Sequence, residues 1–216
     1  AQIVNAPFQD PRISAGETNM PRNLLCVPIK VKDRIIGVVE VRNKGEDASF
    51  SEADLDLLEA VANQSANPIE NASLHKNLRE MYRSTVEALA SAIDAKDRYT
   101  HGHSRRVTLY AQAMADELGW SEDELEEIFF VGLLHDIGKI GVNDAVLGKR
   151  GPLTDDEREH INLHPSRGAE MLEHVSFLVN KIPGVRHHHE RYDGKGYPDG
   201  LQRNQIPIHA QIICIV

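Results

Sequence analysis

The sequence predicts an α+β N-terminal part, a long connecting helix and an all-helical C-terminal part. β-Branched residues dominate residues 24–41, small and apolar positions recur with helical spacing from residue 55 to 92, and apolar helical stripes alternate with capping sequences from residue 104 onward. A chain of 216 residues can hold one large domain or two small ones, with enough residues for a hydrophobic core.

Two strands joined by a polar turn at residues 32–34 are expected within residues 24–41. Valine and isoleucine are common in both strands, and Gly37 suits a bulge or a close approach of another segment. Ser51 is expected to begin a helix, with Asp54 three residues later as its capping partner.

The connecting helix is predicted from a heptad pattern. Its positions are Leu55, Leu58, Ala62, Ser65, Ile69 and Ala72, followed by Leu78, Met81, Thr85, Leu89 and Ala92. This spacing favours pairing with a second helix, so we expect a homodimer. Packing of the helix on its own domain is the alternative. Pro68 lies inside the pattern and is expected to kink or interrupt the helix.

Short helices with defined ends are predicted in the C-terminal part. An apolar stripe over residues 104–118 stops at Gly119, which is typical of a helix C-terminus. The sequences Ser-x-x-Glu at 121–124 and Thr-x-x-Glu at 154–157 are capping boxes. Residues 193–200, DGKGYPDG, predict a loop rich in turns.

Composition limits the partners and the compartment. The formal net charge is −9, which disfavours non-specific attraction to nucleic acid or to an anionic membrane. No apolar run approaches the ~20 residues of a membrane span, and no signal peptide is visible. We therefore expect a cytoplasmic protein without a nucleic-acid partner. Cys26 and Cys214 predict no disulfide framework.

Eleven histidines are present, and most of them fall between residues 101 and 189. His103 lies one turn before Val107 on an apolar stripe, and His135 and Asp136 extend the next stripe. A His–Asp pair in an apolar interior is costly unless it is paired or bound to metal. Imidazoles with one carboxylate and no cysteine suit a first-row divalent cation. Each residue also has a structural interpretation, as a satisfied core histidine or as a pair at a helix end.

Two further groups of histidines leave alternatives open. His160 and His164, at positions i and i+4, could form a two-ligand face or a solvated pair. The consecutive histidines at 187–189 fan out at ~100° per residue if helical, so they cannot all face one point.

Four strings carry a family resemblance: YTHGHSRRV (99–107), LLHDIGKIGV (133–142), GPLTDDEREHINLHPSRGAEML (151–172) and HHERYDGKGYPDGL (188–201). Together they resemble the HD-GYP phosphodiesterases of the HD hydrolase superfamily. The resemblance implies an all-α HD-type helical bundle that holds divalent metal ions, often iron or manganese. It also implies hydrolysis of cyclic di-GMP to pGpG or GMP.

The resemblance implies roles for individual residues. The metal ligands would be His103, His135, Asp136, His164, His188 and His189, with Asp136 bridging two ions. Lys139 would contact a substrate phosphate and, with Asp136, belong to the catalytic residues. The signature loop near the substrate would contain Asp193, Gly194, Gly196, Tyr197 and Pro198; this loop is associated with contacts to diguanylate cyclase (GGDEF) domains. Glu190 and Asp193 are candidate acceptors that would orient the imidazoles.

Two departures from the family pattern change these expectations. Members with three metal ions carry a glutamate where this chain has Tyr99, so we expect two ions. The chain reads QIICIV over 211–216, where the family continues to a further aspartate ligand. We therefore expect the helical bundle to be truncated at its C-terminus, and a chain without that ligand could be inactive.

The N-terminal part has its own resemblance. LLCVPIKVKDRIIGVVEVRNK and FSEADLDLLEAVANQSANPIENA are similar to the second half of a GAF sensor domain. The predicted organisation is a GAF-like half domain over residues 1–75, a connecting helix over 76–95 and an incomplete HD-GYP domain over 96–216.

The leading hypothesis is a metal-dependent cyclic di-GMP phosphodiesterase in bacterial second-messenger signalling. A catalytically inactive adaptor that responds to cyclic di-GMP is one alternative. An HD hydrolase that acts on another nucleotide is the other.

Overall fold

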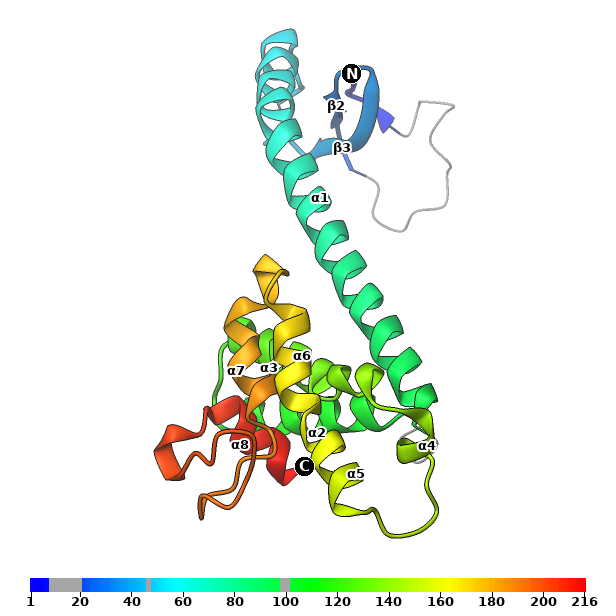
Figure 1. Cartoon of the computed structure of the whole chain (residues 1–216). Helices are drawn as coiled ribbons and strands as arrows, with labels where there is room; N and C mark the ends of the chain where they lie inside the picture. The colour runs from blue at the N-terminus through cyan, green and yellow to red at the C-terminus, as the bar shows by residue number, and fades with distance from the viewer. Residues whose placement is uncertain (8–20, 46–47, 98–101) are drawn as a thin grey trace. The chain divides into compact units, whose positions relative to one another are not determined.

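The computed structural model describes residues 1–7, 21–45, 48–97 and 102–216, and it divides into two compact units, Ala1–Glu80 and Met81–Val216 (Figure 1). The predicted fold class is confirmed: an antiparallel sheet is followed by one long helix and a helical domain. Among the described residues, no helix combines the length and hydropathy that a membrane span requires.

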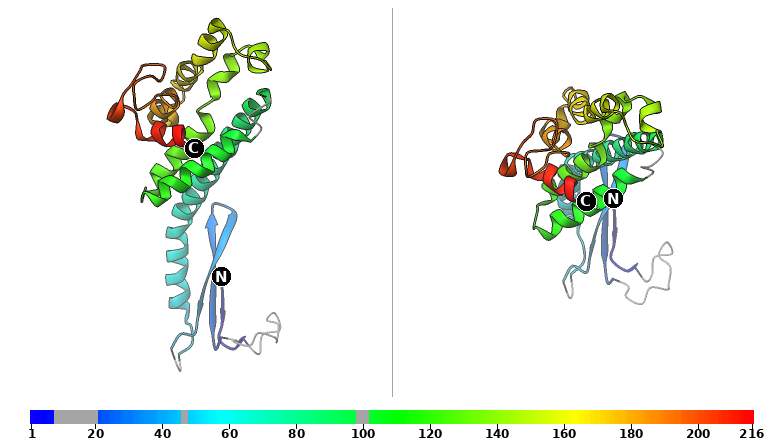
Figure 2. Two further views of the ribbon diagram at one scale, coloured as in Figure 1. Left: turned by 90° about the horizontal axis from the view of Figure 1, so that it is seen from below. Right: turned by 60° about the horizontal axis from the view of Figure 1, so that its bottom comes forward.

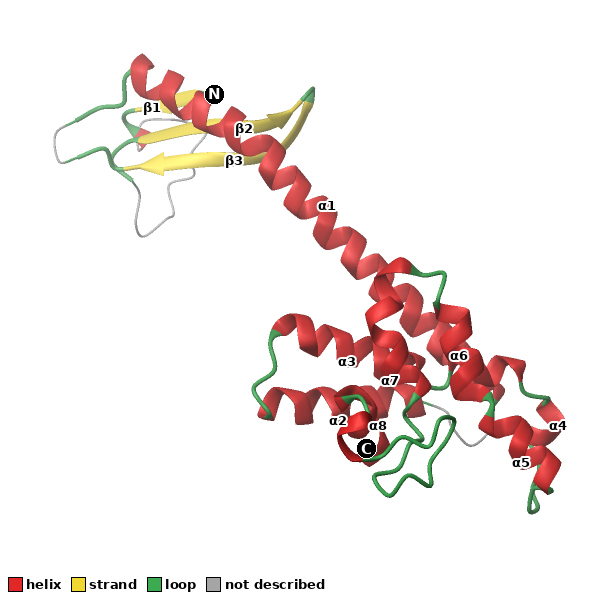
Figure 3. Cartoon of the chain, turned by 60° about the vertical axis from the view of Figure 1, so that its left-hand side comes forward, coloured by secondary structure: helices red, strands yellow, loops and turns green. Residues whose placement is uncertain are grey.

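The first unit contains a three-stranded antiparallel sheet in the order β1-β2-β3, formed by Gln2–Val4, Leu24–Val31 and Arg34–Arg42 (Figure 3). Leu25, Val27 and Ile29 alternate along β2 and point to the buried face. The register shifts between Ile29, which pairs with Gly37, and Lys30, which pairs with Ile35. The irregularity predicted at Gly37 is therefore confirmed.

Helix α1 (Glu52–Lys96) begins at the predicted cap, where the Asp54 carboxylate accepts hydrogen bonds from the Ser51 N–H and Oγ. Ala62 and Ala66 are buried and belong to the same apolar cluster as Val27 of β2. This part of the predicted heptad therefore packs on its own sheet, which is the alternative to pairing with a second helix.

Pro68 was expected to kink or interrupt the helix, and the interruption is wrong, because α1 runs through it. The kink stays a prediction. Proline removes one hydrogen bond, to the carbonyl of Gln64. Both residues are exposed, so water can bind the freed carbonyl while the flanking hydrogen bonds maintain the helix.

The second unit is built from short helices (Figure 2). In chain order they are α2 (His103–Glu117), α3 (Glu122–Leu134), η2 (Ile137–Gly141), α4 (Asp144–Leu147), α5 (Asp155–Asn162), α6 (His164–Leu172), η3 (Ser176–Lys181), α7 (Ile182–Arg186), η4 (Arg203–Gln205) and α8 (Ile208–Ile215). The capping boxes predicted at Ser121 and Thr154 are both present and begin α3 and α5. Cys26 and Cys214 are free thiols, as predicted.

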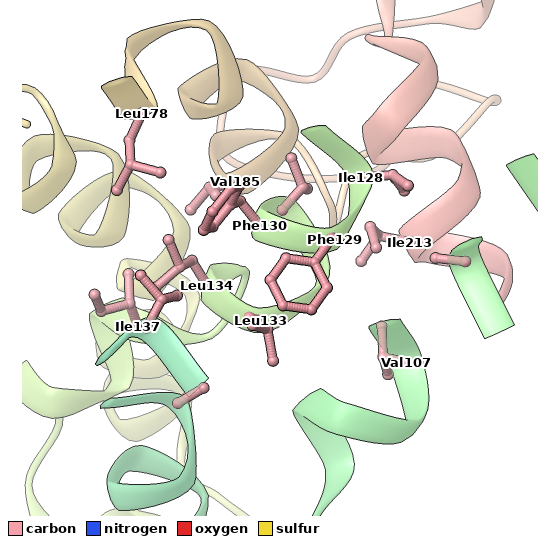
Figure 4. Packing of buried hydrophobic residues seen from close by; sticks show 14 of the residues in the cluster. Val107, Ile128, Phe129, Phe130, Leu133, Leu134, Ile137, Leu178, Val185 and Ile213 are labelled. Carbon is pink, nitrogen blue, oxygen red and sulfur yellow. The ribbon is translucent and has the colours of Figure 1, made fainter. Parts of the chain in front are cut away.

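Helix α3 is the centre of this unit. All seven residues from 128 to 134 are buried, because α2, α7 and α8 pack around the helix. Phe129, Val185 and Ile213 are among the side chains that fill the space between these elements (Figure 4). The C-terminal end of α3 is thus held deep in the core, and this end carries His135 and Asp136.

The last turns of α1 also join this core. Val86, Ala90 and Ile93 are buried in it, whereas the predicted heptad positions Met81 and Leu89 are 61% and 41% exposed. In this part of α1, the predicted heptad positions and the buried residues therefore lie on different faces of the helix.

Candidate metal centre

Four separate segments bring the six predicted ligands together. His103 begins α2, His135 and Asp136 directly follow α3, His164 begins α6, and His188 and His189 follow α7. The ligand atoms of Asp136, His164, His188 and His189 lie within 4.8 Å of one another, as do those of His103, His135 and Asp136. The two groups share Asp136, so the described residues contain a His/Asp cluster that could bind metal.

The two oxygens of Asp136 face different imidazoles. Oδ1 lies 3.2 Å from Nε2 of His164 and 4.0 Å from Nε2 of His188. Oδ2 lies 3.3 Å from Nε2 of His135 and 3.9 Å from Nε2 of His103. A carboxylate in this position can contact two cations at once, one through each oxygen.

Backbone carbonyls orient three of the imidazoles. His135, His164 and His188 each place Nδ1 at 2.6–2.8 Å from the carbonyl oxygen three residues earlier in the chain. A hydrogen bond from Nδ1–H to a carbonyl fixes the tautomer in which Nε2 carries the lone pair. The acceptors are the carbonyls of Gly132, Ile161 and Val185.

The expectation that Glu190 and Asp193 orient these imidazoles is therefore wrong. Each of the three histidines lies next to a short helix or at its end, where carbonyls without a helical partner are close enough to accept. Glu190 instead accepts hydrogen bonds from the backbone N–H groups of Asp199 and Leu201, and Asp193 forms an ion pair with Arg191.

Two pairs of imidazole nitrogens lie close together in the cluster. Nε2 of His164 lies 3.2 Å from Nε2 of His188, and Nε2 of His135 lies 3.3 Å from Nε2 of His103. In the first pair both Nδ1–H groups already donate to carbonyls, so two lone pairs face each other. Two acceptors this close repel unless a proton or a cation lies near both. The donor set of imidazole and carboxylate suits a first-row divalent ion.

Burial lowers the pKa of two imidazoles in the cluster, whereas for His135 the contacts with Asp136 and the Gly132 carbonyl outweigh burial and raise the pKa. Burial lowers the pKa of His188 well below the usual value, with a further contribution from the neighbouring His135 and His189. Burial also lowers the pKa of His189 to about 4. For Asp136, burial raises the pKa, but the nearby His135, His164 and Lys139 outweigh it and hold the pKa well below its usual range. Neutral imidazoles and an ionised carboxylate are the protonation states that bind metal.

Lys139 lies at the edge of the cluster. Its Nζ is 2.8 Å from Oδ2 of Asp136 and 3.3 Å from Oδ2 of Asp97. Burial lowers its pKa, but these two carboxylates outweigh burial and raise it, so the ammonium group stays charged. Its predicted contact with a substrate phosphate stays a prediction.

The predicted signature loop follows the last two histidines. The ring of Tyr197 stacks on the ring of His189, with centroids 4.8 Å apart. Gly196 lies against the backbone of residues 189–191, where an added Cβ would come within 2.6 Å of the carbonyl oxygen of His189. Tyr197 therefore reaches the candidate metal centre, and a cis peptide bond joins it to Pro198. Burial raises the pKa of Tyr197 to about 12, so its hydroxyl stays protonated.

Asp193 and Gly194 occupy the far end of this loop. Asp193 forms an isolated bridge with Gln202, and its carboxylate accepts from the N–H of Lys195 and pairs with Arg191. Gly194 has a φ of +76°, which favours glycine in this turn. Neither residue belongs to the ligand groups around Asp136.

Asp97, which is buried beside Lys139, is not among the site residues predicted from the sequence. His160 lies outside the ligand groups of the described residues, whereas His164 is buried within one, so His160 and His164 form neither a two-ligand face nor a solvated pair. Tyr99, on which the expected number of ions depends, lies outside the described residues.

A cleft of about 410 Å³ lies beside the cluster. Leu163 directly precedes His164, and Tyr197 stacks on His189, so these two lining residues connect the cleft to the candidate ligands. The other lining residues are Asp155, Arg158, Glu159, Asn162 and Pro198.

Comparison with known proteins gives two family matches. The model described as an HD domain matches residues 87–216, and the model described as a GAF domain matches residues 1–69. The boundaries predicted at 75 and 95 stay predictions.

Several curated proteins are similar to this chain. The 3'3'-cGAMP-specific phosphodiesterase 2 of Vibrio cholerae is 35% identical over 83% of this chain and 35% of its own length. The cyclic di-GMP phosphodiesterase response regulator RpfG of Xanthomonas campestris is 40% identical over 64% of this chain and 37% of its own. A cyclic di-GMP phosphodiesterase of Pseudomonas aeruginosa is 43% identical over 58% of this chain and 31% of its own length. The chain thus spans about a third of the length of these relatives.

Proposed function

Because the chain belongs to the HD domain family, we propose that it carries the catalytic centre of a metal-dependent phosphodiesterase that hydrolyses cyclic di-GMP. The observation that carries the proposal is the position of Asp136, whose two oxygens face two separate groups of imidazoles. The relatives named cyclic di-GMP phosphodiesterases support the choice of substrate.

Two divalent cations, iron or manganese, are the proposed cofactors. His103 and His135 would hold one ion, the histidines at 164, 188 and 189 would hold the other, and Asp136 would bridge them. Such a pair supplies a nucleophile at neutral pH and neutralises the charge that develops on a phosphodiester.

The residues around the ions have their own proposed roles. Lys139 places a buried positive charge next to Asp136, where it would contact a phosphate oxygen. Tyr197 and Pro198 connect the cluster to the cleft of about 410 Å³, which offers room for part of a nucleotide. Hydrolysis of one ring phosphodiester would give linear pGpG, and hydrolysis of the second would give GMP.

The assembly is also a proposal. The heptad positions Leu78, Met81 and Leu89 are 43%, 61% and 41% exposed, which supports a homodimer through α1. The loop of residues 193–202 is the proposed contact for a diguanylate cyclase (GGDEF) domain, and the cytoplasm is the proposed compartment.

A second candidate function is hydrolysis of a mixed cyclic dinucleotide. It is favoured by the relative that matches 83% of this chain, whose name specifies 3'3'-cGAMP. Both candidates use the same cluster and differ only in which bases are recognised.

The test is to prepare the full-length protein anaerobically, load it with Mn²⁺ or Fe²⁺, measure its metal content, and incubate it with cyclic di-GMP and with 3'3'-cGAMP. The expected result is about two ions per protein and a linear product, both lost in Asp136→Asn and retained in the control His160→Ala. A full-length protein that binds cyclic di-GMP without cleaving it would favour the adaptor alternative. Absence of bound metal would overturn the proposed function.

A further inference from the structure

Lys96, the last residue of α1, is bound to the segment between Asp136 and Val142. Its Nζ donates to the carbonyl oxygens of Ile140 and Val142, both at 2.8 Å, and to that of Lys139 at 3.3 Å. We propose that Lys96 is a positioning residue, which holds the 3₁₀ helix η2 so that the residues around it keep their places in the candidate metal centre. The effect on metal and catalysis rests on the proposed function, whereas the effect on the η2 backbone does not.

The backbone around the end of η2 has polar groups that need partners. The carbonyl of Lys139 already accepts from the N–H of Val142, but the carbonyls that follow it lie beyond the last turn, where a helix offers no intrahelical donor. An ammonium group offers three donors. Lys96 supplies donors to three of the four consecutive carbonyls from 139 to 142. The fourth, of Gly141, accepts from Nη1 of Arg167 at 3.1 Å. Two side-chain cations therefore bind the whole stretch.

On the side of α6, η2 is held by direct backbone contact in addition to the hydrogen bond from Arg167. A Cβ added to Gly138 would lie 2.6 Å from the backbone nitrogen of Gly168 and closer still to the carbonyl oxygen of His164. The backbone of η2 thus touches the backbone of α6 directly. Loss of Lys96 would release one side of η2 and leave this contact in place.

The ion pair of Lys96 with Asp144 is a minor part of its environment. The two groups are 3.3 Å apart, but the Asp144 side chain is 80% exposed, against 26% for Lys96. An ion pair with so exposed a partner contributes little. The carbonyls are the main partners, so Asp144 offers a matched control.

The same end of α1 holds the neighbouring parts of the site. Asp97 pairs with Lys139, and the Asp94 carboxylate accepts from the N–H of Ser104 at 3.1 Å and from its Oγ at 2.7 Å. Ser104 directly follows His103. A displacement of the last turn of α1 would therefore be transmitted to His103 and to Lys139, and Lys96 is the contact that holds this turn to the backbone of η2.

Hydrogen exchange of the metal-free chain tests the backbone part of the proposal. In Lys96→Met, the amides of residues 137–142 should exchange at least about tenfold faster, while those of 128–134 in α3 keep the wild-type rate. Lys96→Arg, which keeps a charged donor, should stay closer to wild type, and Asp144→Asn should not differ from it. Lys96→Gln, which keeps an uncharged donor, gives the same comparison if Lys96→Met does not fold.

Mn²⁺ titration of the same variants tests the effect on the site. Lys96→Met should weaken Mn²⁺ binding about tenfold. Loss of a group that supports a metal ligand typically lowers metal affinity by about 10–100-fold, and this is the lower end of that range. The proposal is overturned if Lys96→Met behaves like Asp144→Asn, or if exchange rises equally in 128–134, which would mean general destabilisation. A wild-type chain that binds no Mn²⁺ would overturn the proposed function, while the exchange experiment would still decide whether Lys96 holds η2.

Discussion

Substitution of Gly138 by alanine should disturb the candidate metal centre more than its size suggests. Gly138 lies in η2 between Asp136 and Lys139, and it faces the backbone of α6 at its first turn. The added methyl group would meet the backbone nitrogen of Gly168 at 2.6 Å and the carbonyl carbon of His164 at 2.8 Å. Both atoms belong to the backbone, so no side chain can rotate away to make room.

The expected cost follows from these contacts. Real Cβ atoms essentially never approach other heavy atoms within 3.0 Å, so η2 and α6 must separate by several tenths of an ångström or more. Overpacking of a core typically costs 1–3 kcal/mol, and a clash with three backbone atoms belongs at the upper end of that range. About 3 kcal/mol corresponds to a Tm lower by about 10 °C for a unit of this size.

The assay compares Gly138→Ala with Gly151→Ala by thermal unfolding and by Mn²⁺ titration. An added Cβ at Gly151 would meet nothing within 4 Å, so this control makes the same chemical change without the clash. Gly138→Ala should also bind Mn²⁺ at least about tenfold more weakly, because η2 directly follows Asp136. If the two variants unfold within about 1 °C of each other and bind Mn²⁺ equally, the close contact between η2 and α6 is not what positions the site.

Three further predictions follow. Mn²⁺ at a hundred times its Kd should stabilise the wild-type chain by about 2.7 kcal/mol, seen as a higher Tm, and should leave Asp136→Asn unchanged. Glu190→Gln should lower the free energy of unfolding by about 1.5–3 kcal/mol, because an NH₂ group replaces one of the two oxygens that accept hydrogen bonds from backbone N–H groups. Proteolysis within residues 193–202 should then become faster, and an unchanged cleavage rate would refute this role of Glu190. The hydrogen bonds from Ser121 lower the pKa of Glu124 from its usual value of 4.5. Wild type should therefore have a higher Tm than Glu124→Gln at pH 7, and this difference should disappear as the pH falls below about 4.5 and through the lowered pKa; a difference that does not change with pH would refute the assignment.

The local elements could be predicted from sequence because their causes act over a few residues. The capping boxes at Ser121 and Thr154 each need one partner three positions away, and both are present as predicted. The two strands predicted within residues 24–41 from β-branched residues and a short polar turn are likewise present, as Leu24–Val31 and Arg34–Arg42. The interruption expected at Pro68 does not occur, because a single missing hydrogen bond at an exposed position does not end a helix that is bonded on both sides.

The heptad pattern of α1 does not predict which part of the protein packs against the helix. Ala62 packs on the sheet of its own unit, whereas Met81 and Leu89 are exposed and Val86 is buried in the second core. A spacing of three and four residues places side chains on one face of a helix. It does not specify what lies against that face.

The sequence by itself determined the chemistry that is available: five histidines and one aspartate in strings that resemble HD-GYP phosphodiesterases, at positions next to helix ends. Only the tertiary structure decided that each oxygen of Asp136 faces its own imidazoles, that backbone carbonyls orient those rings, and that Lys96 binds the carbonyls of η2. The physical reason is that residue spacing sets the face of a single helix toward which each side chain points. The meeting of four segments depends instead on how closely their backbones approach, as at Gly138 and α6, and that follows from packing throughout the core.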